Sequence, residues 1–134
     1  MYESGLKMKK IIVKGVVTSG LGKGGYYVSK EPYFSFFSRI FQEKPFPGTL
    51  NVILNDADGV SLKLSRLFRP RVGGAIRFSY GFIKKGEKIF PCVIVRPELS
   101  RHPPNVIELV SPIYLRKALN LRDGDLVEIV IIED

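Results

Sequence analysis

Two short segments hold the residues best suited to chemistry. The first is a glycine-rich loop that contains a lysine, Gly20-Leu21-Gly22-Lys23-Gly24-Gly25, and it directly follows a β-branched run. The second is Pro47-Gly48-Thr49-Leu50-Asn51, in which a hydroxyl and an amide lie two residues apart. On an extended chain both of these side chains point to the same side. Glycine amides and a lysine can surround phosphate groups, and neutral oxygens suit a hard cation. Together the two segments indicate an enzyme that uses a nucleotide.

The glycine-rich loop allows more than one interpretation. It formally matches G-x-G-x-x-G, but dinucleotide-binding folds place a helix after the glycines, whereas Tyr26-Tyr27-Val28 favours a strand. A Walker A loop is excluded, because Gly24 follows Lys23 where Ser or Thr would bind magnesium. The loop is therefore a glycine hairpin whose amides bind phosphates, or an ordinary turn, since glycine permits positive φ in any tight turn.

Thr49 and Asn51 allow two interpretations as well. Leu50 and Val52 alternate with them, so the apolar residues can pack while the polar pair faces away. In the first interpretation the pair faces a cavity and binds Mg²⁺, with phosphate oxygens and water as the remaining octahedral ligands. In the second, both side chains lie on the solvent side of an edge strand.

Glu108 and His102 are further candidates. Glu108 lies in the apolar run Val106–Val110, and alternation turns its carboxylate either into a site or into water. His102, the only histidine, lies in the loop 100–104, where it is a general base or an exposed loop residue. The sequence shows no serine–histidine or cysteine–histidine arrangement and no metal-ligand cluster of His, Cys and carboxylates.

Composition indicates a globular chain. Its 134 residues predict one domain, and 45% hydrophobic and 25% charged residues are typical of soluble proteins. We expect no membrane helix and no export signal, and hence the cytoplasm. The single cysteine, Cys92, excludes an internal disulfide and is expected to be buried in a strand. The net charge is +8, and residues 59–86 hold no acid, so this stretch either attracts a polyanion or forms a basic solvated face.

The expected elements are mainly strands. We predict strands at residues 10–18, 26–29, 49–54, 60–64, 76–80, 88–95, 106–110 and 126–132, separated by turns at 56–59, 85–86 and 123–125. One helix is expected at Tyr33–Phe41 after Pro32, and a second at Ile113–Leu119 after Ser111-Pro112, ending with Asn120 in a left-handed conformation. Many short strands with glycine-rich turns predict an all-β barrel or sandwich with a few short helices.

Three ordered motifs give the chain a specific resemblance. Residues 15–29, residues 47–51 and the tail 106–116 with 121–125 resemble the motifs of the archaeal CTP-dependent riboflavin kinases, whereas residues 56–74 match least. The resemblance implies a six-stranded cradle-loop β-barrel and a single riboflavin kinase domain over residues 1–134. It also implies transfer of the γ-phosphoryl group of CTP to the 5′-hydroxyl of riboflavin, which gives FMN and CDP.

The resemblance also implies roles for individual residues. Mg²⁺ would be held by Thr49 and Asn51, and the flavin would be contacted by Ser100 and Glu108, with Glu108 also the candidate catalytic base. Ser100 departs from the family pattern, in which this hydroxyl is usually a threonine. The nucleotide would be bound by Gly20, Leu21, Gly22, Lys23, Gly24, Gly25, Ile113, Tyr114, Leu115 and Arg116.

A different class of function stays open beside the kinase. A small barrel without catalysis could bind nucleic acid through the acid-free basic stretch, because phosphate contacts need little more than positive charge. No helix-turn-helix or basic arm is legible in the sequence, and phosphate-backbone binding would not require Thr49 and Asn51. We therefore expect CTP and riboflavin as partners, no nucleic acid, no membrane and a monomer.

Overall fold

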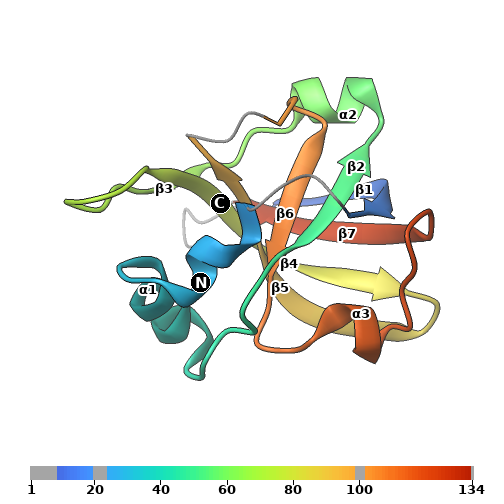
Figure 1. Ribbon diagram of the computed structural model, residues 1–134. Coiled ribbons are helices and arrows are strands. Elements are labelled where there is room, and N and C mark those ends of the chain that lie inside the picture. The colour runs from blue at the N-terminus through green and yellow to red at the C-terminus, as the bar shows by residue number, and fades with distance from the viewer. Residues whose placement is uncertain (1–8, 20–23, 99–101, 134) are drawn as a thin grey trace, which may run out of the picture.

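The protein folds as a closed antiparallel barrel (Figure 1). The computed structural model describes residues 9–19, 24–98 and 102–133. The barrel strands pair in the order β4-β5-β6-β2-β1-β7, and β7 pairs back to β4, which confirms the six-stranded barrel. A short extra strand, β3, pairs with β4 outside this ring. The strands are β1 (Lys9–Thr18), β2 (Leu50–Leu54), β3 (Arg66–Phe68), β4 (Ile76–Lys85), β5 (Lys88–Pro97), β6 (Val106–Val110) and β7 (Leu126–Glu133).

Short helices connect the strands: η1 (Gly24–Ser29, a 3₁₀ helix), α1 (Tyr33–Phe41), α2 (Asp56–Ser61) and α3 (Leu115–Ala118). Helix α1 has the predicted bounds. Helix α3 is shorter than expected, because it begins at Leu115 and not at Ile113. Ser111 Oγ does accept a hydrogen bond from the Ile113 amide at 3.2 Å, but this contact precedes the helix. Asn120 has the expected left-handed conformation, with φ 51°. None of the helices that the structure describes is long and apolar enough to cross a membrane.

Two predicted strands are wrong, and local contacts explain both. Residues 26–29 lie in η1, because Val28 is fully buried against α1 instead of joining a ladder. The predicted turn at 56–59 and the start of the predicted strand 60–64 form α2. Asn55 caps this helix by accepting a hydrogen bond from the Asp58 amide at 2.7 Å, and this cap outweighs the alternating pattern that follows.

Alternating apolar side chains fill the barrel. Val52, Ile94, Ile107 and Ile131 are among the fully buried residues of this interior cluster, and Cys92 is buried there as expected. Closure between β4 and β7 needs a glycine, since a Cβ atom at Gly81 would lie 2.2 Å from the Val130 carbonyl oxygen. The barrel interior is therefore filled by apolar side chains, which leaves the outer face and the ends of the strands for a functional site.

A second apolar layer covers part of the outer face. Helix α1 and η1 pack on β4, β5 and β6, with Phe37 fully buried at the centre. Phe34 and Phe41, which lie three residues before and four residues after Phe37 on the same side of α1, are half-buried. Val95 of this layer pairs across the strands with Glu108, and Glu108 pairs with Asn51. The predicted polar residues thus lie on the same outer face as the cover.

Candidate functional site

Strands β2 and β6 bring two of the predicted site residues into contact. Thr49 Oγ1 donates a hydrogen bond to Glu108 Oε1 at 3.0 Å, although the residues are 59 positions apart. Asn51 lies directly opposite Glu108 in the antiparallel register. Strand β2 is paired on both sides, so the alternative of an edge strand is wrong. The second and third motifs therefore share one polar cluster, which consists of Thr49, Asn51 and Glu108.

The Glu108 carboxyl is removed from water. Only 3% of the residue is exposed, so the alternative of a solvated acid is wrong. Burial raises the pKa of the Glu108 carboxyl, and the hydrogen bond from Thr49 partly opposes this shift. Among the described residues, the printed hydrogen bond to this acid comes from one hydroxyl, and burying a charge is costly unless a partner compensates for it. This environment suits an acid that meets a ligand.

Asn51 supplies an oxygen that the protein itself leaves unused. Its Oδ1 atom is buried and has no hydrogen-bond partner among the residues that the structure describes. In that same part of the chain, no group of three or more His, Cys, Asp or Glu side chains could hold a metal ion. A hard cation would therefore depend on neutral oxygens from Asn51 and Thr49, a donor set that fits Mg²⁺ when ligand oxygens and water complete it.

A cavity of about 190 Å³ opens next to Thr49. It joins the turn of the second motif to the residues of the third, because Gly48 and Thr49 face the segment Ile113–Arg116. Phe46 and Tyr114 stack at its edge, with ring centroids 4.4 Å apart and planes within 5° of parallel. The complete lining is Phe46, Gly48, Thr49, Leu50, Leu109, Ser111, Ile113, Tyr114, Leu115 and Arg116.

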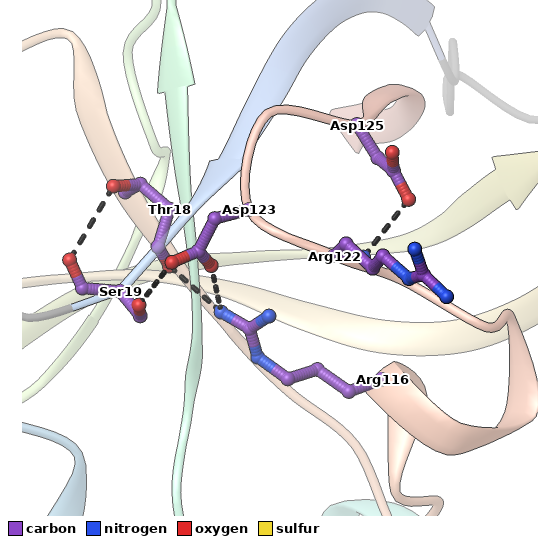
Figure 2. A network of polar contacts seen from close by, with 6 residues as sticks. All are labelled: Thr18, Ser19, Arg116, Arg122, Asp123 and Asp125. Carbon is purple, nitrogen blue, oxygen red and sulfur yellow. Dashed lines mark hydrogen bonds and ion pairs between the residues drawn. The ribbon is translucent and has the colours of Figure 1, made fainter.

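Arg116 links this cavity to the start of the glycine-rich loop (Figure 2). Its Nη2 atom donates to the Thr18 carbonyl at 3.1 Å and to Asp123 Oδ1 at 2.8 Å. The other carboxylate oxygen of Asp123 accepts a hydrogen bond from the Ser19 hydroxyl. The hydrogen bond from Ser19, and then that from Arg116, lowers the pKa of Asp123. Helix α3 is thereby tied to the end of β1.

The first motif is described only in part. Gly20, Leu21, Gly22 and Lys23 lie outside the described residues, and Gly24 and Gly25 are the first two residues of η1. Among the described elements, β1 is followed by η1 and the strand pairings are antiparallel, so the flanking structure is neither a strand hairpin nor a dinucleotide-binding fold. The described ends of the loop, Ser19 and Gly24, connect β1 to the cover of the outer face.

A second cavity, also about 190 Å³, adjoins Glu108. His102 lines it, so the loop histidine lies near the buried acid. Ser100, the predicted flavin contact, lies outside the described residues. Thr49 lines the first cavity and Glu108 the second, so their hydrogen bond joins the two. The lining consists of Arg96, Pro97, His102, Pro103, Pro104, Val106 and Glu108.

Sequence reasoning missed three residues around the site. Arg96 donates to the Leu62 carbonyl at 2.7 Å and the Gly59 carbonyl at 2.9 Å, which joins the second cavity to α2. Phe46 carries the stacked ring at the first cavity. Tyr27 lies in η1 with a buried hydroxyl. No spacing pattern marks Arg96 or Phe46. Tyr27 lies two residues after the last glycine of the glycine-rich loop, and that position was the available signal.

The chain is thus a closed β-barrel protein with a polar cluster between two cavities. A family model for CTP-dependent riboflavin kinases, described as "Domain of unknown function DUF120", matches residues 17–131. The chain therefore belongs to the CTP-dependent riboflavin kinase family.

Similar proteins agree with this family. The chain is 36% identical over 137 residues to the riboflavin kinase of Saccharolobus solfataricus, and the match covers 94% of this chain and 77% of that protein. It is 34% identical to the riboflavin kinase of Sulfurisphaera tokodaii, with 94% of this chain and 98% of that protein covered. The riboflavin kinase of Methanospirillum hungatei is 38% identical, and the chain spans only 60% of its length. Family membership favours a kinase over a non-catalytic nucleic-acid module.

Proposed function

We propose that the protein transfers the γ-phosphoryl group of CTP to the 5′-hydroxyl of riboflavin, giving FMN and CDP. The observation that carries the proposal is the hydrogen bond from Thr49 to Glu108, because it joins the cavity of the predicted nucleotide residues to the cavity beside the predicted flavin residues. Phosphoryl transfer requires the donor and the acceptor to meet in line, and two adjoining cavities suit that requirement.

The first cavity would receive the nucleotide. Arg116, already fixed by Thr18 and Asp123, would add positive charge beside the phosphates, and Gly20–Gly25 with Lys23 would surround them. The stacked pair of Phe46 and Tyr114 offers a flat apolar surface to a base. The preference for CTP rests on the name of the family, and no described residue by itself selects cytosine.

Thr49 and Asn51 would hold Mg²⁺ together with phosphate oxygens. The buried Oδ1 atom of Asn51 supports this assignment, because a ligand would satisfy an atom for which the described part of the chain offers no hydrogen-bond partner. When bound, the ion would neutralise charge that accumulates on the phosphate oxygens. Thr49 would have a second role, since its hydroxyl hydrogen already holds the Glu108 carboxylate in place.

Glu108 would bind the acceptor alcohol from the side of the second cavity. Thr49 occupies its Oε1 atom, so Oε2 would accept the hydrogen bond of the substrate hydroxyl and then its proton. Ser100 would contact the flavin from the loop that precedes β6. In this arrangement the chain orients the alcohol and receives a proton, while the nucleotide site stabilises the negative charge.

A donor comparison tests the proposal. The protein is incubated with riboflavin and Mg²⁺ and, in separate reactions, with CTP, ATP, GTP or UTP, and FMN is separated from riboflavin by chromatography. We expect FMN to form fastest with CTP and in equal amount to CDP. Failure to form FMN with any of the four nucleotides would refute the kinase, and faster turnover with ATP would refute only the donor.

A further inference from the structure

The hydroxyl of Tyr27 is buried, and the described residues offer it no hydrogen-bond partner. Its Oη atom has no hydrogen-bond partner among the residues that the structure describes, although native proteins pair nearly all buried polar atoms. Leaving such a group unpaired costs free energy, so an unpaired group at a site is a candidate for contact with a ligand. Tyr27 lies in η1, two residues after the last glycine of the glycine-rich loop, and packs over the outer face of the barrel.

Aromatic contacts fix the ring of Tyr27. It makes an edge contact with Tyr33 at 5.3 Å between centroids and a tilted contact with Phe37 at 6.5 Å. Tyr33 provides an internal comparison, because its own hydroxyl donates to the Gly74 carbonyl at 2.6 Å. These two tyrosines are in contact in one apolar layer, yet the Tyr33 hydroxyl has a hydrogen-bond acceptor and the Tyr27 hydroxyl has no partner among the described residues.

Tyr27 packs on the apolar layer that contains Val95, and Val95 lies directly opposite Glu108 on the same outer face. Burial raises the pKa of Tyr27 far above its ordinary value, and the negative charge of Glu108 is the second cause, followed by Tyr33. Glu108 pairs with Asn51 across the strands, and Asn51 also carries an unpartnered buried oxygen. Tyr27 therefore belongs to the covering layer that adjoins the polar cluster of Thr49, Asn51 and Glu108.

A ligand that contacts both Tyr27 and Glu108 needs a group that can accept one hydrogen bond and donate another, because Tyr27 offers a donor and the Glu108 carboxylate an acceptor. An alcohol satisfies both groups at once, because it donates to Glu108 and accepts from Tyr27. An anionic group would be repelled by Glu108, and an ammonium group would offer Tyr27 no acceptor. A polyol chain has the required hydroxyls.

We propose that Tyr27 is a substrate-binding residue whose hydroxyl donates a hydrogen bond to a hydroxyl of the polyol chain of the acceptor substrate, and thereby directs that group toward Glu108. This inference rests on the proposed function, in which the acceptor is riboflavin and the polyol is its ribityl chain. It adds a substrate contact from the covering layer, whereas the flavin contacts expected from the family resemblance are Ser100 and Glu108.

The experiment compares Tyr27→Phe with Tyr33→Phe, which also removes only one hydroxyl. Riboflavin affinity is measured by quenching of flavin fluorescence, and thermal unfolding of the ligand-free protein is recorded. We expect Tyr27→Phe to weaken riboflavin binding about 3- to 10-fold, as for loss of one neutral hydrogen bond. Its melting temperature should equal or exceed that of the wild type, whereas Tyr33→Phe should melt lower and bind riboflavin normally.

Lumiflavin, which has the flavin ring without the ribityl chain, locates the contact. We expect wild type and Tyr27→Phe to bind lumiflavin equally. Equal riboflavin affinity in the two proteins would overturn the inference, and so would an equal loss of lumiflavin affinity. A melting temperature as low as that of Tyr33→Phe would show that the hydroxyl has a structural partner. Absence of FMN formation by the wild type would count against the proposed function alone, because these readouts need no turnover.

Discussion

Thr49 and Glu108 meet through a hydrogen bond of 3.0 Å between Thr49 Oγ1 and Glu108 Oε1, on the outer face of a closed barrel. One residue precedes β2 and the other lies in β6, and the register of these two strands brings them together. Because each of the two residues also lines a different cavity, this contact is where a phosphate donor and an alcohol acceptor would adjoin.

Glu108→Gln separates catalysis from stability. We expect kcat/KM for riboflavin to fall about 100-fold or more, because the amide cannot take a proton from the alcohol. The free energy of unfolding at neutral pH should stay equal or rise, since the change removes a buried charge of similar shape. Steady-state kinetics and urea denaturation measure the two effects.

Thr49→Val is the companion variant and has the opposite effect on stability. It leaves the Glu108 carboxylate without its hydroxyl partner, which should cost about 1–3 kcal/mol of unfolding free energy. Ser61→Ala, which loses an exposed hydroxyl contact on α2, is the control and should change neither rate nor stability appreciably. Wild-type kinetics in both Glu108→Gln and Thr49→Val would remove this pair from the chemistry.

Asn51→Ala tests the cation site. We expect a higher Mg²⁺ concentration for half-maximal rate and little loss of stability, because the missing Oδ1 atom had no partner within the described protein. The measurement is a Mg²⁺ titration of the rate of FMN formation.

Asn55→Ala is the matched control for Asn51→Ala. Its side chain caps α2, so this variant should lose about 1 kcal/mol of stability and keep the wild-type Mg²⁺ dependence. The assignment of Asn51 would fail if both variants showed the same Mg²⁺ dependence as the wild type.

Asp123→Asn tests how Arg116 is held. We expect the KM for the nucleotide to rise several-fold, roughly 3- to 10-fold, because the guanidinium loses its carboxylate partner and its fixed position. The KM for riboflavin should not change. Asp125→Asn is the control, since Asp125 lies in the same turn but bonds Lys85 and the Arg122 amide. Equal nucleotide KM values in both variants would separate Arg116 from the nucleotide site.

The same two acids predict a pH dependence of stability. Hydrogen bonds and nearby cations lower the pKa values of Asp123 and Asp125 in the folded protein. The unfolded state therefore binds protons first as the pH falls, so their contribution is present above about pH 4 and is lost below it. Urea unfolding between about pH 2 and pH 6 should show a shallower acid loss in the Asp123→Asn, Asp125→Asn double variant. An unchanged slope would contradict this assignment.

Much of the barrel was predictable because its signals are local. Alternation indicates the first half of β4, apolar β-branched runs indicate β5 and β7, and apolar residues at helical spacing around Phe37 indicate α1. The predicted strand at 26–29 was wrong because Val28 is buried against α1, so these residues form η1. The predicted strand at 60–64 was wrong because its first residues belong to α2, which Asn55 caps. The short strand β3 was missed because three residues on the outer side of β4 carry no period.

The site was predictable in its residue types and not in its geometry. The spacing of Thr49 and Asn51 indicated one face, and alternation of Glu108 left a choice between site and water. Register across β2 and β6, which depends on barrel closure, decided that choice. Tyr27 and Arg96 could not be found in the same way, because their importance comes from an unpaired hydroxyl and from contacts to distant carbonyls. The monomeric state and the cytoplasmic location stay predictions.

The most direct test of the proposed reaction is an isotope-transfer assay. CTP labelled with ³²P in its γ-phosphate is incubated with riboflavin and Mg²⁺, and the transfer of label to riboflavin is measured. The account predicts that radioactivity appears in FMN, in amounts equal to the CDP formed, and that Glu108→Gln nearly abolishes this transfer. Radioactivity that stays in CTP, or that appears only as inorganic phosphate while riboflavin is unchanged, would contradict it.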